Sequence, residues 1–103
     1  QYKEGFPTNT TIGVVASNAR LNKGQAQRVA IMAQTALART IDPVHTMGDG
    51  DVVFCLGAGE LEADLTRLGA ITAWTLARAI TNAVRAAESL RGVPSYRELK
   101  GKP

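Results

Sequence analysis

The sequence predicts an α/β fold that contains two buried strands and two helices, in the order strand, helix, strand, helix. Two apolar runs without polar alternation, at residues 11–17 and 51–56, are each followed by a longer stretch with apolar residues at helical spacing. Uninterrupted apolar runs are typical of strands that are covered on both faces. Two strands alone do not form an independently stable sheet, so we expect further strands to come from another polypeptide segment.

The start of the chain has no secondary-structure pattern. Residues 1–9 lack any hydrophobic period and contain Gly5 and Pro7, both of which interrupt regular structure. We therefore expect residues 1–9 to be a linker or the end of a preceding segment, and the first strand to begin directly after them.

The first helix has a clear start and stop. Asn22, followed three residues later by Gln25, is the pattern of a capping box, and it predicts a helix from about Lys23 to Arg39. Pro43 ends this helix, because proline disfavours helical geometry in the residue before it. One face of the helix is apolar and is predicted to pack in the core; it consists of Ala26, Val29, Ala30, Ala33, Ala36 and Leu37.

The second half of the chain repeats the order of strand and helix. Gly57-Ala58-Gly59 is expected to break the second strand, and a long helix is predicted from about residue 61 to residue 91. Gly92 is placed for a helix C-cap and Pro94 for the stop, so that 95–103 becomes a polar tail. The predicted buried seam of the long helix consists of Leu65, Leu68, Thr72, Leu76, Ile80, Ala83, Ala87 and Leu90.

Composition narrows the classes of function. The 103 residues are 45% hydrophobic and 20% charged, which indicates one globular domain. The net charge of +3 is spread along the chain without a basic run, so no nucleic-acid partner is expected. Cys55 is the only cysteine, so neither an internal disulfide nor a cysteine-based metal site is predicted. We expect no cofactor, no membrane association and, without a signal-peptide pattern, a cytoplasmic protein.

A polar turn at the start of the first strand is a candidate for nucleophilic chemistry. Thr10 lies between Asn9 and Thr11, directly before the apolar run. A threonine hydroxyl needs a base to become an effective nucleophile. If the bond between Asn9 and Thr10 were cut, the new α-amine of Thr10 would titrate near ~7.7–8.0 and could serve as that base. The alternative is an ordinary turn, since these residues also favour turns and caps.

A second candidate lies at Asp49-Gly50-Asp51, before the second strand. It could be a plain turn, and it fits a calcium loop poorly because the later oxygen ligands are missing. It could also be a functional pair, because residues two apart in an extended chain point the same way. Two like charges so placed need a cationic or hydrogen-donating group between them, and the amine and hydroxyl of Thr10 would supply one.

Three other features have weaker functional alternatives. Gly57-Ala58-Gly59 before a helix is similar to a dinucleotide-binding turn, but Glu62 replaces the third glycine, and acidic residues there would repel a pyrophosphate. This glycine pattern supports the rival reading of the chain as a non-catalytic α/β partner subunit or nucleotide-binding lobe. His45 is interpreted as a structural histidine at a junction between loop and strand, and Cys55 as a buried, inert thiol.

Four motifs together resemble the DmpA-like family of self-cleaving peptidases, also called family P1. They are residues 9–15 (NTTIGVV), 37–39 (LAR), 43–46 (PVHT) and 49–54 (DGDVVF), in this order and spacing. The resemblance covers most of residues 9–90. It is to the C-terminal, β-subunit portion of that family, and a threonine combined with Asp-x-Asp is closer to its nylon-oligomer hydrolase branch.

The resemblance implies an αββα-layered fold like that of N-terminal nucleophile hydrolases. This chain would supply about two strands and two helices of it. The family is made as one precursor that cuts itself into an α and a β chain. Residues 1–9 would then end the α segment, and residues 10–103 would be the β part of a single domain.

The resemblance also implies an activity and a set of site residues. Thr10 matches the nucleophile and α-amine base, the bond from Asn9 to Thr10 matches the cleavage site, and Asp49 and Asp51 match the residues that orient the nucleophile. The implied function is an autoproteolytically activated hydrolase that cleaves amide or peptide bonds of a small substrate through an acyl-enzyme. The implied partners are an α chain from the same precursor and further copies of the αβ unit.

Overall fold

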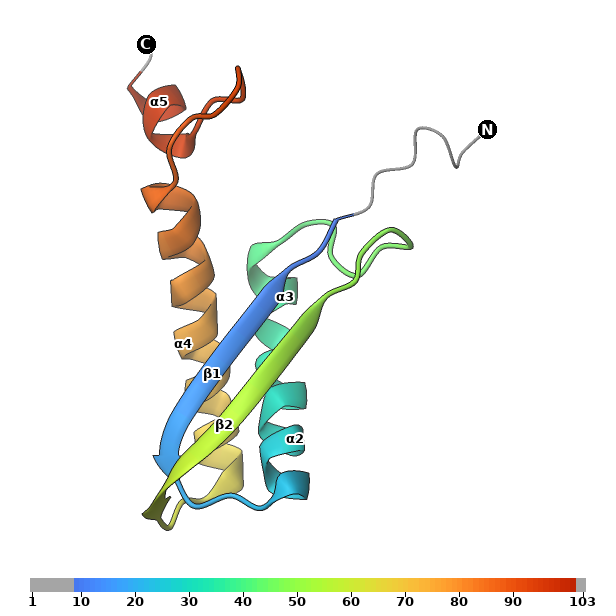
Figure 1. Cartoon of the computed structure of the whole chain (residues 1–103), viewed down its shortest axis with the longest axis vertical. Coiled ribbons are helices and arrows are strands. Elements are labelled where there is room, and N and C mark those ends of the chain that lie inside the picture. Colours follow the sequence, from blue (N-terminus) through green and yellow to red (C-terminus); the bar gives the residue numbers. More distant parts are fainter. Residues whose placement is uncertain (1–8, 102–103) are drawn as a thin grey trace.

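The computed structural model describes residues 9–101 and confirms the α/β class and the predicted order of elements. In chain order the elements are β1 (Ile12–Ala19), α2 (Lys23–Ala33), α3 (Thr35–Thr40), β2 (Val52–Leu61), α4 (Leu65–Ala86) and α5 (Tyr96–Lys100). The two strands lie side by side and are parallel, and α2, α3 and α4 lie on one face of them (Figure 1). The first eight residues of the predicted linker lie outside the described part of the chain.

The two-stranded sheet leaves one apolar face uncovered. In the parallel register Ile12 is opposite Val52 and Val14 is opposite Phe54. Ile12 is 68% exposed and Phe54 54% exposed, because their side chains point away from the helices. We call this surface the open apolar face; its exposed residues are Ile12, Val14, Ala16, Phe54 and Leu56. The strands were predicted to be covered on both faces, and the described residues cover only one of them.

The first helix forms as predicted, with one small interruption. The Asn22 side chain accepts a hydrogen bond from the Gln25 N–H at 2.8 Å, and the Gln25 side chain accepts one from the Asn22 N–H at 3.0 Å. The capping box is therefore confirmed. Gln34 separates α2 from α3, and its N–H is shared between the carbonyls of Ala30 and Ile31, both at 3.2 Å. The predicted apolar face is confirmed, since its central members Val29, Ala33, Ala36 and Leu37 are buried.

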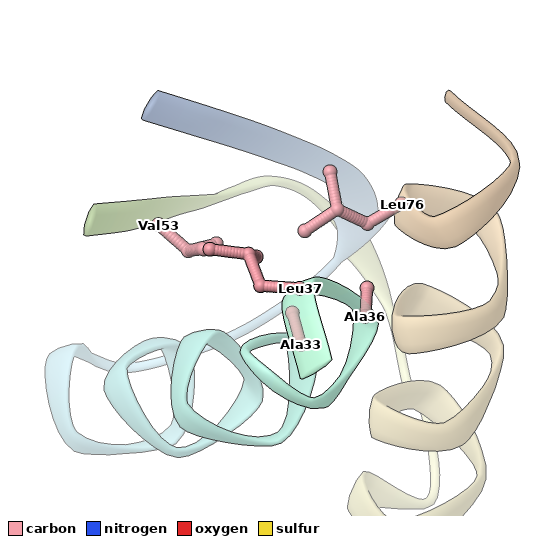
Figure 2. Packing of buried hydrophobic residues seen from close by; sticks show 5 residues of the cluster. All are labelled: Ala33, Ala36, Leu37, Val53 and Leu76. Carbon is pink, nitrogen blue, oxygen red and sulfur yellow. The ribbon is translucent and has the colours of Figure 1, made fainter. Parts of the chain in front are cut away.

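The core is small and lies between the sheet and the helices. Leu37 of α3 is fully buried and packs between Val53 of β2 and Leu76 of α4 (Figure 2). Ala33 and Ala36 complete the cluster, and their small side chains allow the helices to approach closely. Complete burial of a leucine side chain contributes about 1.5–3 kcal/mol, so Leu37 is a major stabilising residue of a fold with few large buried side chains.

The prediction that Gly57-Ala58-Gly59 breaks the second strand is wrong. β2 continues through these residues as far as Leu61. At Gly59 the backbone lies so close to β1 that an added Cβ would be 2.1 Å from the carbonyl oxygen of Asn18. The glycines thus permit close approach of two strands, and no phosphate-binding turn between strand and helix forms here. The dinucleotide-binding alternative loses its structural basis.

Replacing Gly59 with alanine is expected to lower the free energy of unfolding by about 1–3 kcal/mol, the usual cost of overpacking. The new methyl group would collide with a backbone oxygen, which cannot rotate away. Gly24→Ala is the matched control, because a Cβ there would meet only the Asn22 side chain at 3.6 Å; we expect it to stabilise helix α2 by about 0.5–1 kcal/mol. Thermal unfolding of the full-length protein measures both. Equal midpoints for the two variants would contradict this account.

Helix α4, which corresponds to the predicted long helix, is shorter than the predicted range of 61–91. It starts four residues later because β2 extends to Leu61, and it ends at Ala86. Gly92 has a φ of 80°, but it lies in a turn where Leu90 and Val93 exchange backbone hydrogen bonds of 3.1 and 2.9 Å, so it does not cap α4. The predicted polar tail contains the short helix α5.

The predicted buried seam of α4 is confirmed only in the first half of the helix. Thr72 and Leu76 are buried, and Ile80 is half-buried. Ala83, which lies further along α4, is exposed, and so are Ala87 and Leu90 beyond its end. Figure 1 shows that α4 diverges from the two strands toward its C-terminal end, and an open groove separates Ala83 from the start of β1.

The exposed surface is large for a chain of this size. It amounts to 7842 Å², whereas a compact monomer of the same mass exposes about 5,600 Å².

Cys55 is half-buried, and burial raises the pKa of its thiol, which lowers the fraction of reactive thiolate. Within residues 9–101, no helix has both the length and the apolar character needed to cross a membrane.

Candidate active site

The two candidate motifs meet at one end of the sheet. In a parallel pair both strands begin at the same edge, and residues 9–11 and 49–51 directly precede β1 and β2 (Figure 1). The Asn9 N–H donates to the carbonyl of Gly48, and the Gly50 N–H donates to the carbonyl of Asn9, each at 3.0 Å. These two bonds extend the pairing beyond the strands and place the peptide bond between Asn9 and Thr10 beside Gly50.

Thr10 lies against the residue between the two aspartates. Its Oγ1 is 3.3 Å from the point where a Cβ on Gly50 would stand. That distance is tighter than an ordinary van der Waals contact, so a side chain at position 50 would press on the hydroxyl. Thr10 is exposed. The missing side chain at Gly50 leaves room for the hydroxyl.

Asp51 is a buried carboxylate with a hydrogen-bond donor at each oxygen. Its side chain is only 4% exposed. Oδ1 accepts a hydrogen bond from the Thr11 N–H at 3.0 Å, and Oδ2 lies 3.0 Å from Nδ1 of His45. Because Thr11 directly follows Thr10, the carboxylate holds the backbone on the C-terminal side of the candidate nucleophile.

His45 lies against Asp51 and so belongs to the candidate site, which the sequence did not predict. It has a φ of 57°, a left-handed conformation in which histidine, asparagine and aspartate are more frequent than most residues. Its side chain is 46% exposed and pairs with Asp51. A structural histidine at a junction between loop and strand was predicted; His45 lies instead within the loop between α3 and β2, and its partner is a candidate site residue. No local pattern in the sequence indicates this contact, because it depends on how the loop folds.

Asp49 is engaged differently from Asp51. Its Oδ2 accepts a hydrogen bond from the Thr46 N–H at 2.7 Å, and its own N–H donates to the Thr46 carbonyl at 3.0 Å. Asp49 therefore closes a turn at the end of the loop. Among residues 9–101, neither Asp49 nor Asp51 hydrogen-bonds to the Thr10 hydroxyl. The two carboxylates have separate partners, so their pairing around Thr10 stays a prediction.

The described residues do not offer a set of side chains that could hold a metal ion. Within the described residues there is no group of three or more histidine, cysteine, aspartate and glutamate side chains placed to hold an ion. What the cluster offers is a hydroxyl, a polarised carbonyl and a buried carboxylate. These groups suit acyl transfer, in which a nucleophile attacks a carbonyl whose oxygen is held by N–H donors.

Comparison with known families agrees with this chemistry. The family model described as "Peptidase family S58" matches residues 1–97. An uncharacterized aminopeptidase of Mycobacterium leprae is 48% identical over 85% of this chain. A further uncharacterized aminopeptidase, from Mycobacterium tuberculosis, is 40% identical over 90% of the chain. A 6-aminohexanoate-oligomer endohydrolase of Kocuria is 28% identical over 75%.

The compared proteins are much longer than this chain. It spans 28% of the Mycobacterium leprae protein, 31% of the Mycobacterium tuberculosis protein and 25% of the Kocuria protein. No solved structure matches the chain with significance.

Proposed function

Because the chain belongs to peptidase family S58, the DmpA family, we propose that it carries the nucleophile of a hydrolase that cuts amide or peptide bonds. Thr10 is that nucleophile. The names of the relatives, aminopeptidase and 6-aminohexanoate-oligomer endohydrolase, both describe hydrolysis of an amide bond. Small amides or peptides are the substrate class that we propose.

The proposal is carried by the hydrogen bond between the Gly50 N–H and the Asn9 carbonyl, at 3.0 Å. A donor at this oxygen stabilises the negative charge that develops when a nucleophile attacks the carbonyl carbon. The Thr10 hydroxyl belongs to the next residue and lies on the same glycine. Nucleophile, carbonyl and donor thus occur together at one peptide bond.

Self-cleavage follows from these groups in two steps. The Thr10 oxygen attacks the carbonyl carbon of Asn9, the bond from that carbon to the Thr10 nitrogen breaks, and the hydroxyl proton passes to the nitrogen. The product is an ester between Asn9 and the Thr10 side chain. Water then hydrolyses the ester, which releases the Asn9 carboxyl group and leaves Thr10 with a free α-amine and a free hydroxyl.

The same threonine then catalyses turnover. The α-amine accepts the hydroxyl proton as general base, an effect typically worth ~10²–10⁴-fold. The Thr10 oxygen attacks the substrate amide, the amine part leaves with a proton, and water resolves the acyl-enzyme. Asp51 orients the nucleophile through the Thr11 N–H, and Asp49 holds the turn that presents Gly50.

We propose that other polypeptide segments supply the rest of the domain. We propose that residues 1–9 end an α segment of the same precursor, and that residues 10–103 are the β part of one αββα domain. The exposed side chains of Ile12 and Phe54 support a second sheet on the open apolar face, because so much apolar surface is costly in water. The α chain and further αβ units are the proposed partners.

Intact mass and N-terminal sequencing of the purified full-length protein test the proposal. We expect a chain that starts at Thr10, with the α-amine free, because self-cleavage before Thr10 generates that terminus. A chain whose sequence still runs uncut from Asn9 into Thr10 after prolonged incubation would contradict self-cleavage and favour the non-catalytic alternative.

A further inference from the structure

We propose that His45 is a positioning residue for Thr10 and acts through Asp51. This inference rests on the proposed function, and it adds to that function a residue that does not touch the reacting atoms. The path runs from Nδ1 of His45 to Oδ2 of Asp51, and from Oδ1 of Asp51 to the Thr11 N–H, with 3.0 Å at both contacts. The Thr11 nitrogen is bonded to the carbonyl carbon of Thr10, so its position sets the orientation of the nucleophile.

His45 matters because the Asp51 carboxylate is buried. With 4% of the side chain exposed, water has little access to Oδ2. A buried acceptor that loses its donor is costly, and the aspartate χ2 angle is soft. Without the imidazole, the carboxylate would turn toward other donors and loosen its bond to Thr11.

The loop conformation presents the correct imidazole nitrogen. With His45 at a φ of 57°, its Nδ1, the ring nitrogen bonded to Cγ, lies 3.0 Å from Oδ2 of Asp51. Nδ1 must carry the hydrogen in this bond, because an ionised carboxylate only accepts. Both the charged imidazole and one neutral tautomer provide that hydrogen, so the positioning role does not require a change in the charge of His45.

A matched pair of substitutions isolates the donor. Asparagine and aspartate have the same shape, both tolerate the left-handed conformation, and both place an atom on Cγ where the imidazole has Nδ1. Only asparagine has an N–H there. His45→Asn is therefore expected to retain the hydrogen bond to Asp51, whereas His45→Asp would set a second acceptor against it.

The experiment measures precursor cleavage and amide hydrolysis in the full-length protein. We expect His45→Asn to lie within about fivefold of wild type in both rates. We expect His45→Asp to lose roughly 10- to 100-fold in both, the range for loss of one hydrogen bond to a charged group. The loss should fall on kcat and leave KM nearly unchanged, because His45 does not touch the substrate.

Thermal unfolding of each variant checks the fold. Should His45→Asp fail to fold, His45→Gly takes its place, because glycine adopts a φ of 57° freely and removes the donor without adding charge. The expected loss is the same. Equal rates in the variant with the donor and the variant without it would overturn the inference, whether both match wild type or both are slow.

A parallel Thr10→Ala variant separates the two proposals. If Thr10→Ala stays uncut while the two His45 variants are cleaved at equal rates, only the proposed role of His45 is contradicted. If Thr10→Ala is cut normally, the proposed function is wrong, and the inference about His45 fails with it.

Discussion

Replacing Thr10 with alanine is expected to leave the polypeptide uncut and to lower the rate of amide hydrolysis by on the order of 10⁴-fold or more. Alanine lacks the oxygen that attacks the Asn9 carbonyl, so neither the ester nor the free α-amine can form. A denaturing gel and intact mass measure cleavage, and turnover of a small amide substrate measures hydrolysis. Both readouts should fail together, because one side chain serves both reactions.

Two control variants make this result specific. Thr10→Ser keeps a hydroxyl on the same carbon and is expected to retain cleavage at a reduced rate. Thr11→Ala removes the same atoms from the next residue, but it keeps the backbone N–H that Asp51 accepts, so cleavage should continue. Cleavage of Thr10→Ala at the wild-type rate would remove Thr10 from the mechanism. Loss of cleavage in Thr11→Ala would move the nucleophile to Thr11.

Replacing Asp51 with asparagine is expected to slow precursor cleavage and hydrolysis by about 100-fold. The aspartate accepts one hydrogen bond at each oxygen, from Thr11 and from His45. Asparagine has a single acceptor oxygen, so its amide N–H₂ must face either the Thr11 N–H or Nδ1 of His45, and it meets a donor at His45 unless the imidazole carries its hydrogen on Nε2 alone. A buried donor facing another donor costs about 1–3 kcal/mol, and hydrogen bonds to charged groups are at the upper end. Single-turnover kinetics of cleavage and steady-state kinetics of hydrolysis measure the effect.

Asp42→Asn provides the matched control for Asp51→Asn. Asp42 is exposed at the start of the same loop, so the same change of one atom should leave both rates unchanged. Thermal unfolding of both variants distinguishes a displaced nucleophile from a lost fold. Wild-type rates in a folded Asp51→Asn protein would exclude Asp51 from the site.

The meeting of the two motifs depends on a parallel strand pair. Thr11 and Asp51 are forty residues apart and become hydrogen-bonded because each directly precedes a strand of the same parallel sheet. An antiparallel pairing would have put these two segments at opposite ends. The helices between the strands make the parallel connection, so the fold and the candidate site have the same origin.

Local patterns in the sequence determined much of the fold. The capping box at Asn22 and Gln25, the apolar face that includes Leu37 and the start of both strands are all readable from residue type and spacing. These features depend on neighbours within one turn of helix or one strand, where side-chain chemistry is sufficient. Thr10 and Asp51 became candidate site residues through the polar turn at residues 9–11, the Asp-x-Asp pattern at 49–51 and the resemblance to the DmpA-like family.

Only the tertiary structure decided the remaining features. Gly59 reads as a strand breaker in isolation, but it is the one residue type that fits beside the Asn18 carbonyl. His45 reads as a structural residue until the loop brings its Nδ1 to Asp51. In both cases the determining contact is with a residue outside the local pattern, so its effect depends on how the chain packs in three dimensions.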